Sequence, residues 1–176
     1  MSGKPTRGKP QPSRGPASAA HADLDLLQRQ GRGIGKLLRL GHRAYCVAMQ
    51  RELVGHNFTL SEWRHLRTLY DEDGLTPVEI SQRIGIERAS STAVLQSLER
   101  RQLIRRVRSR KDRRNLHVFL TPTGEKLRGT LLPCAVAVNG AARNGLSNDD
   151  VFTFFRLIRT MIANLERPAG RRGPMD

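Results

Sequence analysis

Residues 75–127 read LTPVEISQRIGIERASSTAVLQSLERRQLIRRVRSRKDRRNLHVFLTPTGEKL, and this stretch decides the fold. Thr76 is a helix N-cap that is followed by a proline and, three residues after the cap, by a glutamate able to complete a capping box. The helix that begins here should end at Gly85, because glycine accepts a backbone that strains other residues. A longer helix is predicted over residues 87–101. Two helices joined by so tight a turn indicate a helix-turn-helix.

Two short segments of alternating hydrophobicity follow the longer helix, at residues 103–107 and 116–120. The stretch between them, residues 108–115, is polar and highly charged, as expected for the tip of a β-hairpin. A basic hairpin directly after the helix pair is typical of a winged helix-turn-helix. The predicted fold is therefore mainly α with a small β-hairpin wing.

The segments before this unit are also predicted to be helical. Apolar spacing indicates a helix over residues 25–54, firm from about Ile34 because three glycines weaken its beginning. Residues 58–60 are interpreted as a short extended piece. Ser61 is the expected N-cap of the next helix, which should run to about Glu72.

After the hairpin, the pair Thr121-Pro122 should open a long helix in which Glu125 acts as a capping-box partner. Pro133 is expected to interrupt this helix. A last helix is predicted after Ser147, with two aspartates in its first turn that suit the helix dipole.

The chain of 176 residues carries a formal net charge of +15. Its positive charge is concentrated in one part of the sequence. Residues 83–114 contain eleven Lys and Arg and three acids. A solubility charge would be spread out, whereas a concentrated one favours an anionic partner, above all nucleic acid. Residues 1–22 hold four bases and no acid, and their Pro, Gly and Ser content predicts a disordered basic arm. Residues 167–176 are expected to be a disordered tail.

The helix over residues 87–101 can enter the major groove and present side chains to base edges. Val94, Leu95 and Leu98 are expected to face inward. The exposed side would then carry the candidate DNA contacts Arg88, Ala89, Ser90, Thr92, Ala93, Gln96 and Ser97. The basic hairpin suits the narrow minor groove, which attracts arginine. Its candidate contacts are Arg110, Lys111, Asp112, Arg113 and Arg114. A solvated amphipathic helix beside a solvated loop is the alternative.

Residues 75–127 resemble the multiple-antibiotic-resistance regulator (MarR) family. The most specific likeness is at the wing, where Asp112-x-Arg114 is followed by Val118-x-Leu120-Thr121-x-x-Gly124. The order of elements over residues 34–165 is similar too. The resemblance implies a homodimeric winged-helix regulator that binds a palindromic operator. Because most members of the family are repressors, it also implies repression. It also implies that Arg114 enters the minor groove and that Asp112 positions it.

Two positions depart from the family pattern. Gln102 stands where a glycine is usual, so a left-handed helix C-cap there would be strained. Ser91 occupies a position that is more often apolar.

In the resembling family, the first helix and the last two intertwine with their mates in the dimer. The last helix here agrees, because its apolar stripe would be costly if exposed on a monomer. The stripe consists of Val151, Phe154, Phe155, Ile158, Met161, Ile162 and Leu165. The expected division is a basic arm (1–22), an N-terminal dimerisation and ligand-pocket helix (23–57), a winged helix-turn-helix DNA-binding domain (58–121), C-terminal dimerisation helices (122–166) and a tail (167–176).

The resemblance further implies a small effector that releases the DNA: an aromatic acid, a phenol or an aromatic acyl-CoA, with a catabolic operon as the target. Arginine and histidine can neutralise a carboxylate, and tryptophan and tyrosine can stack on a ring. The candidate lining consists of His42, Arg43, Tyr45, Trp63, Arg64, His65 and Tyr70. The alternative is that Trp63 belongs to the core and that Arg43 and Arg64 form surface ion pairs.

Two rival modes stay open. Cys46 could act as a redox sensor if His42 and Arg43 lower the pKa of its thiol, although a buried, inert cysteine is the plainer interpretation. A sequence-neutral architectural protein would instead bind DNA through the arm and the wing, with equal affinity for any duplex.

Other classes of function are not favoured. Cys46 and Cys134 do not make a disulfide framework, and the five histidines lack ligand spacing, so no metal or other cofactor is expected. No catalytic motif is present, so an enzyme is not expected. No apolar run approaches the roughly 20 residues of a membrane span, and no signal-peptide core is seen. A cytoplasmic location is therefore expected.

Overall fold

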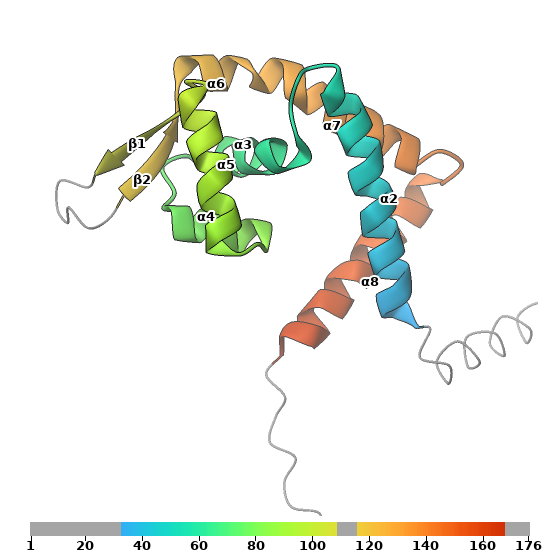
Figure 1. The fold of residues 1–176 in the computed structure, drawn as a ribbon. Helices are drawn as coiled ribbons and strands as arrows, with labels where there is room; N and C mark the ends of the chain where they lie inside the picture. Colours follow the sequence, from blue (N-terminus) through green and yellow to red (C-terminus); the bar gives the residue numbers. More distant parts are fainter. Residues whose placement is uncertain (1–32, 109–115, 168–176) are drawn as a thin grey trace, which may run out of the picture. The chain divides into compact units, whose positions relative to one another are not determined.

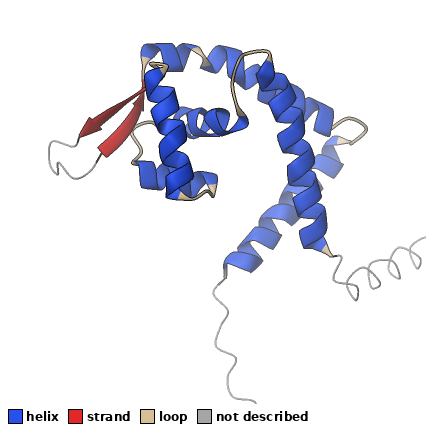
Figure 2. Cartoon of the chain, in the orientation of Figure 1, coloured by secondary structure: helices blue, strands red, loops and turns tan. Residues whose placement is uncertain are grey.

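The computed structural model describes residues 33–108 and 116–167 (Figures 1 and 2). In chain order its elements are α2 (Ile34–Val54), α3 (Leu60–Asp71), α4 (Pro77–Ile84), α5 (Arg88–Arg100), β1 (Ile104–Arg108), β2 (Leu116–Leu120), α6 (Pro122–Lys126), α7 (Arg128–Ala142) and α8 (Asn148–Glu166). The prediction of a mainly helical fold with a β-hairpin wing is confirmed. The predicted basic arm, residues 109–115 of the predicted hairpin tip and all of the tail beyond residue 167 lie outside the described residues. Arg108, predicted in the tip, is instead the last residue of β1.

The chain divides into two compact units, residues 1–44 and 45–176. The core lies in the second unit. Its fully buried side chains come from α2, α3, α4, α5, the hairpin and α7, and they include Met49, Leu53, Leu66, Leu69, Ile80, Leu95, Leu98, Ile104, Val118 and Leu131.

Helices α3 and α4 begin at capping boxes. At α4 the prediction is confirmed: the Thr76 side chain accepts from the backbone N–H of Glu79, and Glu79 accepts in return from the Thr76 N–H. At α3 the prediction is wrong, because Thr59 and not Ser61 is the N-cap. Thr59 has a glutamate three residues on, at Glu62, which completes a capping box, and this reciprocal pair decides where the helix starts.

The ends of the two helices differ in strain. Gly85 ends α4 with φ of 74°, the left-handed conformation that glycine adopts without cost. After α5 the same conformation falls on Gln102, with φ of 57°. The N–H of Leu103 then donates to Leu98 O at 3.0 Å, which closes the helix in the Schellman pattern. The expected strain at Gln102 is therefore present.

The hairpin is attached to the turn between α3 and α4. β1 and β2 pair antiparallel from Ile104↔Leu120 to Arg108↔Leu116. Leu75 forms a bridge to Val118, and the Asp73 carboxylate accepts from the N–H of Leu120 at 2.9 Å. The His117 ring, whose Nδ1 lies 2.8 Å from Gly74 O, is the third point of attachment. The root of the wing is therefore joined to the helix-turn-helix by more than chain continuity.

The helices after the wing break at a different place from the one predicted. Pro133 lies inside α7, and the break falls at Leu127, between α6 and α7. Glu125 is not a capping-box partner; it pairs with Arg128 at 3.1 Å, while the cap is the Thr121 hydroxyl, which accepts from Gly124 N. A Cβ at Gly124 would lie 2.0 Å from Leu103 O, so only glycine fits where α6 crosses the base of the wing.

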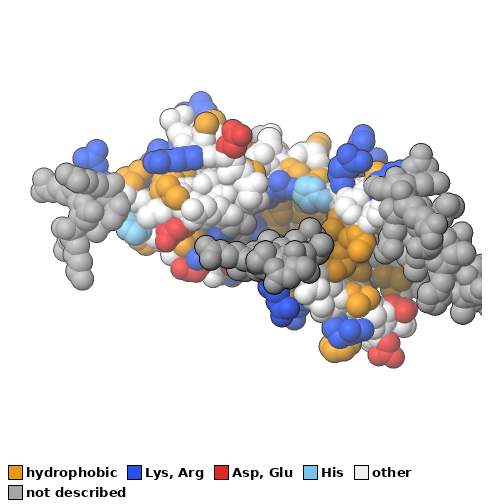
Figure 3. All heavy atoms as spheres, turned by 90° about the horizontal axis from the view of Figure 1, so that it is seen from below, with side chains coloured by type: hydrophobic (Ala, Val, Ile, Leu, Met, Phe, Trp, Pro, Cys, Tyr) orange, Lys and Arg blue, Asp and Glu red, His pale blue; other side chains and the backbone are white. Residues whose placement is uncertain are grey.

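The last helix, α8, begins at Ser147 as predicted, with a capping box to Asp150. It contains no buried residue. Phe152, Phe154 and Phe155 are 71%, 58% and 55% exposed. Hydrophobic side chains are visible at the surface of the face drawn in Figure 3. Of the predicted apolar stripe, Phe154, Phe155, Ile162 and Leu165 are exposed in the described residues, whereas Val151, Ile158 and Met161 are half-buried.

Candidate nucleic-acid interface

Helix α5 presents one polar face and one buried face. Ser91, Leu95 and Leu98 are buried, and Val94 is half-buried, so the predicted inward face is confirmed. The predicted DNA contacts that are exposed are Arg88, Ala89, Ser90, Thr92, Ala93 and Gln96. Ser97 differs, because it is half-buried and its hydroxyl donates to Glu62 at 3.1 Å. The first two turns of α5 therefore offer small and hydrogen-bonding groups on a convex surface that a major groove admits.

The arginines near α5 fall into two groups. Arg83, Arg101 and Arg106 form ion pairs with Glu72, Glu62 and Glu99, at 2.7, 3.1 and 3.3 Å. Arg88, Arg100 and Arg108 are exposed and make no ion pair with another residue inside the described ranges. Positive charge on the second group is therefore open to an external anion such as a phosphate.

The wing contributes charge at its described end. Arg105 lies over the Phe119 ring, with its guanidinium carbon 5.0 Å from the ring centroid, and both Arg105 and Arg108 are exposed. The ring restrains the Arg105 side chain without removing its charge. The predicted minor-groove residues Arg110, Lys111, Asp112, Arg113 and Arg114 lie outside the described residues.

Two polar contacts join α5 to α3, and sequence reasoning assigned neither. In the first, the Nε2 of His65 lies 3.0 Å from Ser91 Oγ, and its Nδ1 lies 2.7 Å from Ser61 O. His65 is fully buried and Ser91 is 1% exposed. Burial lowers the pKa of His65, and the hydrogen bond to Ser61 offsets this only in part. The imidazole is therefore held in its neutral form.

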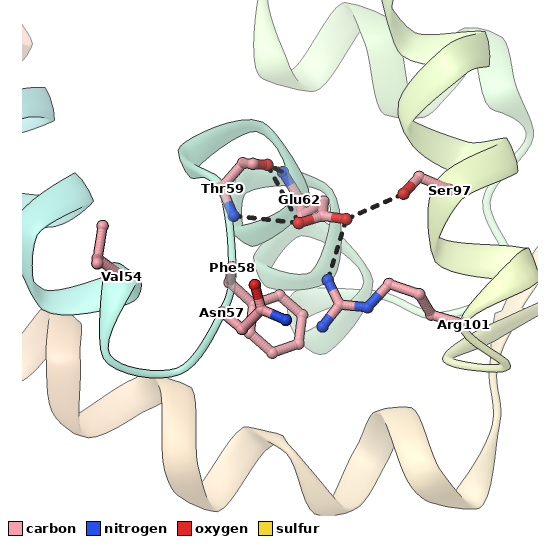
Figure 4. Close-up of a pocket in the computed structure, with 7 residues that line it drawn as sticks. All are labelled: Val54, Asn57, Phe58, Thr59, Glu62, Ser97 and Arg101. Atoms are coloured by element: carbon pink, nitrogen blue, oxygen red, sulfur yellow. Dashed lines mark hydrogen bonds and ion pairs between the residues drawn. The ribbon is translucent and has the colours of Figure 1, made fainter.

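The second contact is a charged cluster around Glu62 (Figure 4). One carboxylate oxygen accepts from the Thr59 N–H, and the other accepts from Ser97 and Arg101, each at 3.1 Å. Burial acts to raise the pKa of Glu62, but the hydrogen bonds from Thr59, Arg101 and Ser97 outweigh it and leave the pKa below its usual value. The Arg101 guanidinium also stacks on Phe58, 4.1 Å from the ring centroid.

This cluster lines an open cavity of about 540 Å³. The lining residues are Val54, Asn57, Phe58, Thr59, Glu62, Ser97 and Arg101. An aromatic ring, a guanidinium and an amide thus border one space, a combination that can hold a flat organic anion. None of the ligand-pocket residues predicted from the sequence lines it.

The structure places three of those seven predicted residues in the interior. Trp63, His65 and Tyr70 are buried at 5%, 0% and 5% exposure. Tyr70 donates its hydroxyl to Gly124 O at 3.0 Å, and burial raises its pKa to about 12. These three side chains serve the core, as the alternative interpretation allowed for Trp63. Residue chemistry alone does not separate a core aromatic from a ligand-binding one, and the ligand pocket predicted from the sequence stays a prediction.

The remaining predicted pocket residues lie on α2 and α3. His42 and Arg43, in the first unit, are exposed, and Tyr45 is 38% exposed. Arg64 is half-buried and donates to Cys46 Sγ at 3.1 Å. A cation from α3 therefore lies beside the Cys46 thiol.

Comparison with known proteins was made by sequence and by structure. A family model described as the MarR family matches residues 56–115. TtmR of Methylorubrum extorquens, named as a helix-turn-helix transcriptional regulator, is 33% identical over 50% of this chain and 45% of its own length. The chain thus spans about half of that relative. The transcriptional repressor NicR of Pseudomonas putida is 23% identical over 73% of this chain and 82% of its own length.

A third relative is the homoprotocatechuate degradative operon repressor of Escherichia coli, which is 33% identical over 41% of this chain and 49% of its own length. Among solved structures, a MarR transcriptional regulator from Methanosarcina mazei superimposes with a TM-score of 0.69 at 22% identity, over 74% of this chain and 94% of its own. BpsR of Bordetella bronchiseptica, whose DNA binding is regulated by 6-hydroxynicotinic acid, superimposes with a TM-score of 0.66 at 25% identity, over 72% and 96%.

Within the described ranges, no helix is both long enough and apolar enough to cross a membrane.

Proposed function

Since this chain belongs to the MarR family of winged-helix regulators, we propose that it binds a palindromic operator as a homodimer, represses transcription there, and is released by a small aromatic effector. The family consists of transcriptional regulators and not of enzymes. Each finer part of the proposal is supported by a separate feature of the molecule.

Operator binding is supported most directly by the polar face of α5. Its exposed first two turns carry one arginine among small and hydroxyl side chains, and Arg100 and Arg108 lie exposed near its far end and on the wing. In this arrangement Arg88 would meet a guanine edge, because its guanidinium can donate to two acceptors at once. Arg100 and Arg108 would meet phosphates, which position the protein without reading sequence.

Homodimerisation is supported by α8. A helix that exposes Phe152, Phe154 and Phe155 by more than half would be a liability on a free monomer. A second copy of the same helix offers a complementary apolar surface, and a two-fold axis would place the two recognition helices on successive turns of the DNA, about 34 Å apart.

The operator proposal is tested by genomic selection. The purified protein is mixed with sheared DNA of its source organism, and the retained fragments are sequenced. One enriched palindrome supports a specific regulator. Retention of all fragments without enrichment would instead support the architectural alternative. Arg114→Ala should abolish most of the retention, whereas Arg88→Ala should retain DNA but broaden the enriched sequence.

For the effector, we propose an aromatic carboxylic acid. BpsR responds to such an acid, and the homoprotocatechuate repressor controls the breakdown of one. The cavity beside Arg101 is a better place for it than the pocket predicted from sequence, because Trp63, His65 and Tyr70 are buried. A carboxylate there would compete with Glu62 for Arg101, and the aromatic body would contact Phe58.

The effector proposal is tested with two neighbouring arginines of α5. Release of the enriched duplex is measured while benzoate, hydroxybenzoates and 6-hydroxynicotinate are titrated. Arg101→Gln should weaken the response to the active acid by about tenfold or more, in line with the loss of a charged hydrogen bond. Arg100→Gln, the matched control, should weaken DNA binding but leave the response intact. A wild-type response in Arg101→Gln would remove the cavity from consideration.

A further inference from the structure

A buried histidine and a buried serine meet between α3 and the helix proposed to read DNA. His65 is fully buried and both of its ring nitrogens lie at hydrogen-bond distance from an oxygen, Nδ1 from Ser61 O at 2.7 Å and Nε2 from Ser91 Oγ at 3.0 Å. A carbonyl oxygen only accepts, so Nδ1 carries the proton. The other nitrogen then accepts, and the Ser91 hydroxyl is its donor. One tautomer and one direction of the hydrogen bond follow from the geometry.

Neither residue is an obvious choice for its place. Ser91 is the first member of the inward stripe of α5, ahead of Leu95 and Leu98, and the three are 1%, 1% and 0% exposed. A buried hydroxyl or imidazole without a hydrogen-bond partner destabilises the folded protein. Each residue therefore removes the penalty that the other would incur, and an apolar pair would fill the same space without directional contacts.

The start of α5 needs such a contact more than the starts of its neighbours do. Thr59 and Thr76 cap α3 and α4 through their side chains, but Glu87, at the N-cap of α5, makes no side-chain capping hydrogen bond. Ser91 lies in the first turn after it. The hydrogen bond from Ser91 to His65 thus ties to α3 the turn that lacks a cap.

We propose that His65 is a positioning residue which, through Ser91, fixes the rotation of α5 about its own axis and so determines which side chains meet the base edges. This inference rests on the proposed function, in that α5 must be the helix that reads DNA. The contacts of Leu95 and Leu98 are apolar and non-directional, so they tolerate small rotations. A rotation of about 20° moves an atom about 6 Å from the helix axis by about 2 Å, enough to break a hydrogen bond to a base.

The consequence is selective. Base contacts from Arg88, Ser90 and Thr92 depend on the rotation of α5, whereas phosphate contacts from long arginine side chains adapt to it. Loss of the His65–Ser91 hydrogen bond should therefore reduce discrimination between DNA sequences and leave sequence-neutral binding nearly unchanged.

The test uses the full chain and two duplexes: the one most enriched from sheared genomic DNA, and a scrambled duplex of the same composition. The main variant is the double replacement His65→Leu with Ser91→Ala, which leaves no buried polar group unpaired. We expect its ratio of affinities for the two duplexes to fall about tenfold, with an unchanged salt dependence on the scrambled duplex. The single variant Ser91→Thr, in which His65 is unchanged, keeps the hydroxyl and should have the wild-type ratio.

A matched control is available on α4. Ser81 is also a buried serine, at 5% exposure, but its hydroxyl donates at 2.8 Å to Val78 O in its own helix. Ser81→Ala should therefore change stability without changing the affinity ratio. A wild-type ratio in the double variant would overturn the proposal. If the wild-type protein itself does not distinguish the two duplexes, the proposed function fails first, and this inference with it.

A spectroscopic measurement needs no variant. Nitrogen-15 spectra of the wild-type imidazole should show His65 as the Nδ1–H tautomer, with Nε2 unprotonated at neutral pH. An Nε2–H tautomer or a freely exchanging ring would mean that Ser91 is not the donor, and it would overturn the proposal even if every variant failed to fold.

Discussion

The winged helix-turn-helix and helix α8 differ in whether their apolar side chains are buried. In the former, Leu66, Leu98 and Ile80 are fully buried, and α3 and α4 begin at complete capping boxes. In α8 the capping is equally good, with Ser147 and Asp150 forming a capping box, yet none of its residues is buried. Both regions are helical by local rules, so the difference lies in what covers them. The first is complete within one chain, whereas the second leaves apolar side chains exposed in the described residues.

The largest expected difference between the two regions is in the stability of the monomer. Leu98→Ala removes a fully buried side chain and should lower the free energy of unfolding by about 2–5 kcal/mol. Leu157→Ala, on α8 at 48% exposure, is the matched control and should cost less than about 1 kcal/mol. Urea unfolding at low protein concentration measures both. Equal losses would mean that α8 belongs to the same core.

The next effect concerns association. Replacing Phe154 and Phe155 by serine should raise the dissociation constant of the proposed dimer at least tenfold, or by about 1.4 kcal/mol, because two rings that are exposed in the single chain are removed from the proposed interface. Sedimentation velocity over a dilution series measures this. Thr153→Ser, at the residue directly before them, is the control. An unchanged mass at every dilution in the double variant would place the dimer interface elsewhere.

A smaller effect is expected on the pH dependence of stability. It should arise in the winged helix-turn-helix, which contains His65, and not in α8. Burial keeps the pKa of His65 below 6.5 in the folded protein, so below pH 6.5 the unfolded chain binds the proton more readily. Stability should therefore be fully present above that pH and should decline as pH falls through 6.5 towards the folded pKa. His65→Leu should remove this component. Thermal melting between pH 5 and 8 tests it, and identical pH profiles for both proteins would contradict it.

The smallest effect should come from relieving Gln102. Its left-handed backbone strains any side chain, so Gln102→Gly should stabilise the protein by up to about 1 kcal/mol. Arg100→Gly, two residues earlier within α5, should instead destabilise it by about 0.5–1 kcal/mol. Chemical denaturation resolves the two signs. Destabilisation by both would indicate that the Gln102 side chain makes a contact that outweighs its strain.

The sequence predicted the helix start at which several local signals agree. It missed the start at which two neighbouring residues have similar chemistry. The cap of α4 was evident because Thr76, Pro77 and Glu79 agree. Thr59 and Ser61 are both hydroxyl residues, and only the glutamate at position 62, three residues after Thr59, distinguishes them. That signal was present in the sequence.

The break after the wing was less accessible. Pro133 is tolerated within α7, although proline usually interrupts a helix. The actual break, at Leu127, comes three residues after Gly124, which approaches Leu103 O closely in a contact between distant segments. Such contacts leave no periodic pattern.

The functional residues divide in the same way. The exposed face of α5 followed from helical periodicity, and it is confirmed for Arg88 and Thr92. The His65–Ser91 pair joins residues 26 positions apart, and its only trace in the sequence is a polar residue in each of two apolar stripes. The cavity beside Arg101 is lined by residues of three separate segments, so no single stretch of sequence could predict it.

The attachment of the wing to the turn before α4 has a consequence for the geometry of the bound duplex. Leu75, Asp73 and His117 join the hairpin root to the helix-turn-helix, so the two cannot slide past each other without breaking backbone pairing. The root of the wing and α5 are therefore held at a fixed separation. If each enters a groove of the DNA as proposed, the number of base pairs between the two grooves should be the same at every site, and the sites should differ in their bases and not in their spacing.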